Sequence, residues 1–328
     1  MRGLFRKEAM MQMRKLGRLW PVSALALGGA GLGQLWGPTD REEAVATLRE
    51  GVDAGINLID VAPRYGNGEA ERVVGEAFGG KLPSGVHIST KHHLGNPPAA
   101  EVIPRLERAL AESLERMRLR FVDIYFLHSS IVPRDELGNE RRTPRSLFAK
   151  TVRPAFEKLI ADGLIGAWGI TAVEMPSAIL ETLADEPSPA VAQCIANALD
   201  SPGEMKWSDE PARPREIISA ARENGVGVMG IRAVQAGALT DRVDRDLPYD
   251  NPVMIDYRRA QPLRTIAREV GMSTAAFAHR YALSMDGVDT VVLGIKNRSE
   301  LRDCLAAEAA GPLPLDIIAK IDSGQIAA

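Results

Sequence analysis

Four side chains that can take up or release a proton each end or closely follow a short apolar segment of the chain. They are a carboxylate, a phenol, an amine and an imidazole: Asp60, Tyr65, Lys91 and His128. Brought together, such groups can deliver a proton to an oxygen atom on which negative charge develops. Each also has an ordinary structural alternative, as a helix cap, a packed aromatic, a solvated lysine or a core histidine. Whether they meet depends on the elements that carry them.

The apolar segments and the stretches between them predict an alternation of strands and helices. The strand pattern occurs at eight places: 23–27, 56–60, 86–90, 123–127, 166–170, 190–194, 226–230 and 290–293. Helical periodicity separates them, as in 40–54 and 99–118. Thr39 or Asp40 is expected to cap the first of these helices. The strand segments are apolar enough to be buried on both faces of a parallel sheet.

Eight such units predict a single-domain α/β fold, a closed (β/α)8 TIM barrel. The alternative is an open, doubly wound sheet. It is less favoured because the glycine cluster at 28–33 does not match the G-x-G-x-x-G pattern of dinucleotide-binding sheets. The active site of a TIM barrel lies at the C-terminal ends of its strands, which is where the four candidate side chains occur. We therefore expect them to converge at one mouth of the barrel.

The composition limits the class of protein. The 328 residues include 40 Lys and Arg against 43 Asp and Glu, a net charge of −3, which argues against a dedicated nucleic-acid-binding protein. Cys194 and Cys304 match no zinc or disulfide pattern, so we expect no metal. The uncharged stretch 19–39 is too rich in glycine for a membrane helix, so we expect a cytoplasmic protein without membrane association. We assign 14–328 to the barrel and 1–13 to an N-terminal extension.

The residues around the first candidate side chains resemble a family signature. Segment 55–71, G-I-N-L-I-D-V-A-P-R-Y-G-N-G-E-A-E, is similar to the G-x-N-x-x-D-T-A-x-x-Y-G-x-G-x-S-E signature of the aldo-keto reductase family, with Val61 and Ala70 as departures. Segments 88–91 and 122–128 resemble the second and third motifs of that family. The resemblance extends over nearly the whole chain.

The resemblance implies an NAD(P)H-dependent oxidoreductase that interconverts a small-molecule carbonyl (an aldehyde, ketone or sugar) and its alcohol without a metal. Tyr65 would be the general acid or base, and a charged Lys91 beside it would lower the pKa of the phenol by favouring the phenolate. Asp60 would hold Lys91 charged and in place. His128 would donate to the substrate oxygen or orient it. The nicotinamide would supply the hydride.

The cofactor contacts that the resemblance implies depart in part from the family pattern. Thr171 replaces a serine and Gln193 is retained, both as partners of the nicotinamide carboxamide. Arg232 replaces a small hydroxyl residue and is expected to reach the pyrophosphate or the substrate. The complete implied set is Thr171, Gln193, Arg232, Val234, Gly294, Lys296, Glu300 and Cys304. Trp36 and Trp168 are candidates for the wall of a substrate pocket.

The preference between the two dinucleotides depends on a few charges near the end of the chain. Lys296, Arg298 and Arg302 are cations that can bind a 2′-phosphate, with Lys296 as the expected contact. Glu300 and Cys304 replace residues that commonly bind the adenosine half in the family. We favour NADP(H) over NAD(H).

Two other functions stay open at this point. One is a non-catalytic regulatory barrel that binds the nicotinamide cofactor and senses redox state. The other is a barrel enzyme that forms a Schiff base on Lys91, against which the spacing of Asp60 and Tyr65 argues. The sequence predicts neither the substrate and reaction direction nor the oligomeric state.

Overall fold

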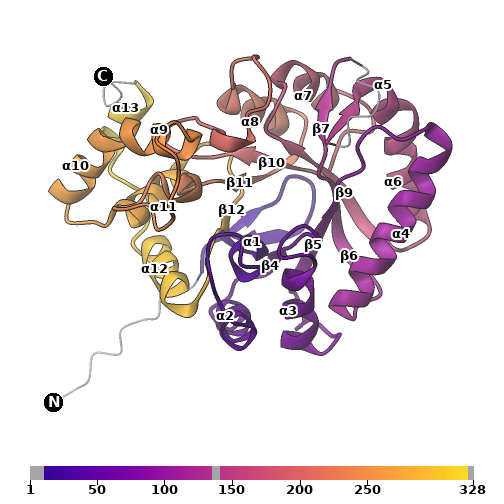
Figure 1. Ribbon diagram of the computed structural model, residues 1–328, viewed down its shortest axis with the longest axis horizontal. Coiled ribbons are helices and arrows are strands. Elements are labelled where there is room, and N and C mark those ends of the chain that lie inside the picture. The colour runs from indigo at the N-terminus through magenta and orange to yellow at the C-terminus, as the bar shows by residue number, and fades with distance from the viewer. Residues whose placement is uncertain (1–10, 135–140, 324–328) are drawn as a thin grey trace.

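The computed structural model describes residues 11–134 and 141–323, in which eight parallel strands form a closed barrel (Figure 1). The strands follow one another around the barrel in chain order, and the last pairs with the first. They are β3 (Leu25–Gly28), β4 (Leu58–Asp60), β5 (His87–His92), β6 (Val122–Leu127), β9 (Ile165–Ala172), β10 (Val191–Ile195), β11 (Gly227–Ile231) and β12 (Thr290–Leu293). The predicted TIM barrel is confirmed, and each of the eight predicted strands overlaps an observed one.

Helices connect the strands and surround the barrel (Figure 1). They are α1 (Gly29–Leu32), α2 (Arg41–Asp53), α3 (Glu69–Phe78), α4 (Ala99–Met117), α5 (Arg145–Leu147), α6 (Arg153–Ala161), α7 (Pro176–Leu183), α8 (Pro214–Glu223), α9 (Pro252–Arg259), α10 (Gln261–Glu269), α11 (Thr274–Ser284), α12 (Arg298–Ala309) and α13 (Leu315–Asp322), with single turns η1 (Phe148–Val152), η2 (Gly203–Met205) and η3 (Gln235–Gly237). Helix α2 begins as expected, because the Asp40 side chain accepts a hydrogen bond from the Glu43 N–H at 2.7 Å. In α4 the buried residues include Leu106, Leu110 and Met117, which recur at the spacing of one helical face.

A short hairpin that the sequence did not predict packs at the N-terminal end of the barrel strands. It consists of β1 (Met13–Lys15) and β2 (Pro21–Ser23). Leu16 between them is fully buried, and the Gly17 N–H donates to Asp289, just before β12, at 3.1 Å. Strands of three residues have too few positions to show a periodic pattern. The hairpin leaves the opposite end of the barrel as the place for a site.

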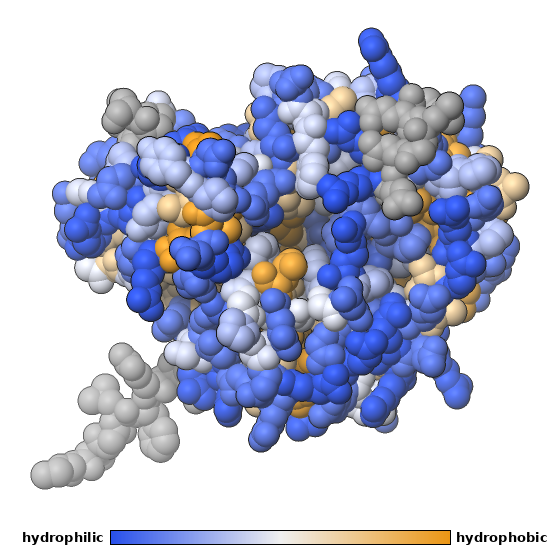
Figure 2. Space-filling view, viewed as in Figure 1, coloured by the Kyte–Doolittle hydropathy of each residue, from blue (hydrophilic) through white to orange (hydrophobic). Residues whose placement is uncertain are grey.

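The ends of the chain and one loop bear on other expectations. Of the expected extension 1–13, residues 1–10 lie outside the described residues, and Met13 begins β1. In the loop after β6, strands β7 (Ser130–Val132) and β8 (Arg142–Pro144) pair in parallel. Within the described ranges, no helix has the length and apolar character needed to cross a bilayer. The face seen in Figure 2 is largely hydrophilic and is hollowed near its centre.

Candidate active site

A cavity of ≈ 1010 Å³ lies at the C-terminal end of the barrel strands. Its size fits the range of small-molecule and cofactor sites. Most of the side chains that the sequence predicted for the site line it: Trp36, Asp60, Tyr65, His128, Thr171, Gln193, Arg232, Val234, Gly294, Lys296, Glu300 and Cys304. The two exceptions are Lys91, which lies behind the cavity wall, and Trp168.

Asp60 and Lys91 form a buried ion pair beside the cavity. Lys91 Nζ donates to Asp60 Oδ2 at 2.7 Å and to the Val61 carbonyl at 3.0 Å, and its side chain has no exposed surface. Ser89 donates to Asp60 Oδ1 at 2.6 Å. Ser89 was not among the predicted site residues, although strand alternation places it on the same face as Lys91, two residues further on. Both carboxylate oxygens are therefore engaged, and the position of the ammonium group is fixed.

Tyr65 and His128 complete the group of four. Lys91 Nζ lies 5.0 Å from the centroid of the Tyr65 ring. The Tyr65 and His128 rings are 6.2 Å apart and nearly perpendicular. The structure thus brings together all four side chains from the loops and strand ends of β4, β5 and β6, and the phenol and the imidazole line the cavity.

Burial has the largest effect on the acidity of the phenol. It raises the pKa of Tyr65 above the ordinary value of 10.0, although the charge of Lys91 and its hydrogen bond to the phenol oppose the rise. The expectation of a net lowering is therefore wrong for this structure. Burial also acts against the charge of Lys91, but the attraction of Asp60 and Tyr65 outweighs it and raises the pKa of the amine. At neutral pH the phenol is protonated and the amine is charged.

The imidazole beside them is neutral. Burial first, and then the charge of Lys91, keep the pKa of His128 well below the ordinary value of 6.5. His128 Nδ1 has no hydrogen-bond partner in the described part of the chain. The His93 ring lies 4.7 Å from that of His128, and burial followed by the charge of Arg64 lowers the pKa of His93 to about 4. His93 was not among the predicted site residues, because its position depends on how the loop after β5 turns.

A hydroxyl and an amide are among the other buried polar groups of the cavity that have no partner in the described part of the chain. Thr171 Oγ1 and Gln193 Nε2 make no hydrogen bond to any described residue, and the two residues are 9% and 3% exposed. They lie directly opposite each other in the parallel pairing of β9 and β10. Buried donors and acceptors are normally satisfied, so an adjacent hydroxyl and amide without partners indicate a place for a polar ligand group. A carboxamide, which has both a donor and an acceptor, fits this pair.

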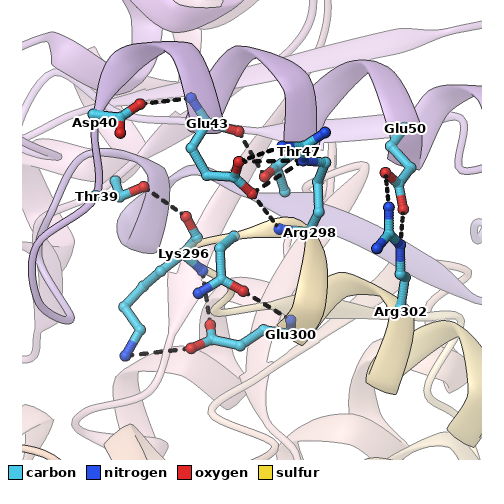
Figure 3. Close-up of polar contacts among 10 residues, drawn as sticks. Thr39, Asp40, Glu43, Thr47, Glu50, Lys296, Arg298, Glu300 and Arg302 are labelled. Atoms are coloured by element: carbon cyan, nitrogen blue, oxygen red, sulfur yellow. Dashed lines mark hydrogen bonds and ion pairs between the residues drawn. The ribbon is translucent and has the colours of Figure 1, made fainter.

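The opposite part of the cavity is lined by the loop after β12. Lys296 Nζ forms ion pairs with Asp244 at 2.5 Å and with Glu300 at 3.3 Å. Glu300 also accepts from the Lys296 N–H at 2.8 Å (Figure 3). Cys304 is nearly buried and its Sγ lies 3.6 Å from His279 Nε2. The lysine expected to bind a 2′-phosphate is therefore already paired with two carboxylates.

The other two cations of this segment point toward α2 (Figure 3). Arg298 pairs with Glu43 at 2.7 Å, and Arg302 pairs with Glu50 at 2.6 Å. Neither arginine lines the cavity. Of the three cations predicted to lie near a 2′-phosphate, only Lys296 borders the cavity.

Trp168 lies outside the cavity, which corrects the expectation that it lines a substrate pocket. Its ring stacks on Phe156 of α6 with centroids 5.8 Å apart, and its Nε1 donates to Glu157 at 2.5 Å. The side chain is 3% exposed. Its position on β9 sends it outward between the barrel and α6, because successive strand residues face opposite sides.

The chain is similar to several known proteins. L-galactose dehydrogenase of Arabidopsis thaliana is 26% identical over 303 residues, covering 90% of this chain and 88% of that protein. D-threo-aldose 1-dehydrogenase of a Pseudomonas species is 25% identical, covering 93% and 94%. The solved structure of an aldo-keto reductase from Bacillus halodurans, in its holo form, is similar with a TM-score of 0.71 at 24% identity, covering 97% of both chains.

The family comparison is more specific than the likeness of single proteins. The model of the aldo/keto reductase family matches residues 24–325, which include every barrel strand and every candidate side chain described above. The chain therefore belongs to the aldo/keto reductase family.

Proposed function

We propose that the protein is an oxidoreductase that interconverts a carbonyl compound and its alcohol with a nicotinamide dinucleotide, using Tyr65 as the general acid or base. The observation that carries this proposal is the placement of the Tyr65 phenol at the cavity wall, 5.0 Å from the ammonium of the buried Lys91–Asp60 ion pair and next to the His128 ring. Membership of the aldo/keto reductase family supports the reaction class. The two relatives named for aldose substrates favour a sugar or another small polyhydroxylated carbonyl.

Each catalytic side chain has a separate task in this proposal. In reduction, Tyr65 donates its proton to the substrate oxygen as negative charge grows there, and the charged Lys91 stabilises the phenolate that is left. Asp60 keeps Lys91 charged and in place through its 2.7 Å hydrogen bond. The neutral His128 has one N–H that can donate to the same substrate oxygen. When bound, the nicotinamide supplies or accepts the hydride.

The residues around the cavity fit such a cofactor. The unpartnered Thr171 hydroxyl and Gln193 amide can bind its carboxamide, and Ile231 at the end of β11 can support the face of its ring. We propose NADP(H) as the preferred dinucleotide, with Lys296 as the contact to the 2′-phosphate. This requires Lys296 to exchange Asp244 or Glu300 for the phosphate.

The Schiff-base alternative has less support. Lys91 is fully buried, lies outside the cavity lining and is paired with Asp60, whereas a nucleophilic amine must be neutral and reach the carbonyl carbon. A barrel that only binds the cofactor and regulates a partner would need none of the proton chemistry that the four side chains offer.

The function is tested with a panel of aldehydes, ketones and sugars, and with the corresponding alcohols, by following the absorbance of the reduced cofactor. Turnover of at least one compound is expected, and it should be lost in Tyr65→Phe. Tight cofactor binding without turnover of any compound would favour the regulatory barrel. Borohydride-dependent attachment of a carbonyl substrate to Lys91 would favour the Schiff-base enzyme.

A further inference from the structure

Arg64 is a cation at the wall of the cavity and precedes the phenol of Tyr65 in the chain. It lines both the main cavity and a second one of ≈ 260 Å³, and His93 and His128 also line both. The Arg64 side chain forms no ion pair or hydrogen bond with any residue in the described ranges. We propose that the carbonyl substrate carries a carboxylate or phosphate group that binds to Arg64 and His93, an inference that rests on the function proposed above.

The carboxylates in this part of the cavity are already paired with other cations. At the ends of β4, β5, β6 and β9 and in the loops that follow, the described carboxylates that line the cavity belong to Asp60 and Glu174. Asp60 pairs with Lys91 at 2.7 Å, and Glu174 pairs with Arg142 at 3.2 Å. Arg64 therefore adds a positive charge that neither carboxylate neutralises. An anionic substrate group suits this place, because a guanidinium group forms strong, charge-assisted hydrogen bonds with carboxylates and phosphates.

His93 offers a hydrogen-bonding group beside this charge. Its Nδ1 is buried and has no partner among the described residues. Burial and then the charge of Arg64 lower the pKa of His93 to about 4, so at neutral pH its imidazole is uncharged and has one N–H to donate. The His93 ring lies 4.7 Å from that of His128, which donates to the reacting oxygen in the proposed function. An anionic group in contact with His93 is therefore only a few bonds from the carbonyl carbon.

A second arginine adds positive charge near His93. Arg141 Cζ lies 4.6 Å from the centroid of the exposed Trp207 ring, and both residues line the cavity. The charge of Arg141 also acts to lower the pKa of His93, after burial and the charges of Arg64 and His92. A cavity wall with an excess of one sign of charge attracts ligands of the opposite sign. The surroundings of His93 thus favour an anionic substrate over a neutral or a cationic one.

Pairs of substrates that differ in one anionic group test the inference on the full-length protein. The pairs are glyoxylate with acetaldehyde, 4-oxobutanoate with butanal, and D-glyceraldehyde 3-phosphate with D-glyceraldehyde, each measured with NADH and with NADPH. In at least one pair, the kcat/KM of the anionic member is expected to exceed that of the neutral member by about 10- to 100-fold, the range of a charge-assisted contact. The first two pairs test a carboxylate and the third tests a phosphate.

Variants then locate the preference. Arg64→Gln should lower the ratio of the two kcat/KM values by about 10- to 100-fold. Arg72→Gln is the matched control and should keep the wild-type ratio, because Arg72 is an exposed arginine of α3 that pairs with Glu69 and lines neither cavity. His93→Asn, which keeps a side-chain N–H, should retain more of the preference than His93→Phe.

The dependence on salt gives a second readout that needs no variant. Because Arg64 is exposed, added salt should reduce the preference of the wild type for the anionic member of a pair. A wild type that turns over the neutral member of every pair at least as well, or a folded Arg64→Gln that keeps the ratio, would overturn the inference and leave the proposed function standing. A protein that turns over no carbonyl compound, neutral or anionic, would instead refute the proposed function.

Discussion

The protonation state of Tyr65 depends on two opposing effects, burial and the charge of one neighbouring side chain. Burial disfavours the phenolate, whereas Lys91 favours it, and burial has the larger effect in this structure. The group is therefore arranged as a proton donor at neutral pH. In the direction of alcohol oxidation the same phenol must first lose its proton, so the two directions should respond differently to pH.

Replacement of the phenol tests its chemical role. Tyr65→Phe keeps the ring and removes the proton, so kcat should fall by about 10²- to 10⁴-fold while the Kd of the cofactor changes little. The measurement is single-turnover reduction together with cofactor titration. If the variant keeps more than about a third of wild-type kcat, on a substrate whose chemical step limits the rate, Tyr65 is not the acid.

The direction of the pKa shift gives a prediction for pH dependence. Because the pKa of Tyr65 is raised above 10.0, the phenol stays protonated at neutral and mildly alkaline pH. The kcat/KM for reduction should then be flat from about pH 6 to about pH 9, while that for oxidation should rise about tenfold per pH unit over this range. Both profiles need an isotope effect to show that hydride transfer limits the rate. An oxidation profile that levels off near neutral pH would show that a bound ligand or Lys91 brings the pKa down.

The sequence predicted the reactive side chains better than the groups that adjust them. Asp60, Tyr65, Lys91 and His128 could be placed because each lies at or just beyond the C-terminal end of a strand, a position that periodicity locates to within a few residues. His93 and the unpartnered state of the Thr171 hydroxyl depend on loop paths and neighbour packing. A linear pattern carries no information on either.

At the scale of the elements, the loop after β12 lines the cavity, whereas helix α12, which follows it, forms ion pairs with α2. The ion pairs of Arg298 with Glu43 and of Arg302 with Glu50 bridge the first and last long helices of the barrel (Figure 3). Because both arginines are exposed to water, these pairs contribute little to stability. The sequence predicted that these arginines lie near the cofactor. Their position after β12 could be predicted, but the direction in which their side chains point from α12 could not.

Lys296 is the remaining candidate for discrimination between the dinucleotides. Lys296→Ala should weaken NADPH by about 10- to 100-fold and leave NADH nearly unchanged, because only NADPH carries the 2′-phosphate. Titration of both cofactors measures this. Arg302→Ala is the control, because Arg302 is a cation of the following helix α12 that does not border the cavity. Equal losses of affinity for both cofactors would show that Lys296 does not recognise the 2′-phosphate. A wild type that prefers NADH would contradict the proposed preference itself.

The start of α2 gives a prediction about stability. Asp40 accepts a hydrogen bond from the Glu43 N–H at 2.7 Å, and this helix also carries both acidic partners of α12. Asp40→Ala should lower the free energy of unfolding by about 0.5–2 kcal/mol, the usual contribution of an N-cap. Asp53→Ala removes an exposed carboxylate from the other end of the same helix, where it opposes the helix dipole, so that variant should be neutral or slightly more stable. Equal losses in both variants would show that the N-cap hydrogen bond of Asp40 is not the source of the loss.

For the whole molecule, the number and order of strands could be predicted because each βα unit repeats the same pattern of an apolar run followed by an amphipathic helix. The cavity could not be predicted, because its wall is assembled from loops of every unit and its volume depends on what those loops leave unfilled. The hairpin at the other end of the barrel could not be predicted for a related reason. Its strands are short, and its position depends on contacts with distant residues, such as that between Gly17 and Asp289.

Closure of the barrel leaves no room for a side chain at position 28. Strands β12 and β3 pair through Leu293 and Leu27, and a Cβ added at Gly28 would lie 2.0 Å from the Leu293 carbonyl oxygen. Gly28 has an ordinary φ of −86°, so the constraint there is space between two strands and not backbone conformation. Gly28→Ala should therefore force the closing strands apart, lowering stability by about 1–3 kcal/mol or more.

Gly163→Ala is a matched variant that distinguishes steric crowding from backbone strain. Gly163 has a φ of +71° and open space around its missing Cβ, so Gly163→Ala meets only the backbone penalty of about 1–2 kcal/mol. Thermal unfolding of both variants should give the larger loss of Tm for Gly28→Ala. A smaller loss there would mean that the closing strands can separate locally at little cost. In that case close packing of the last strand, β12, against the first, β3, would not be required to close the barrel.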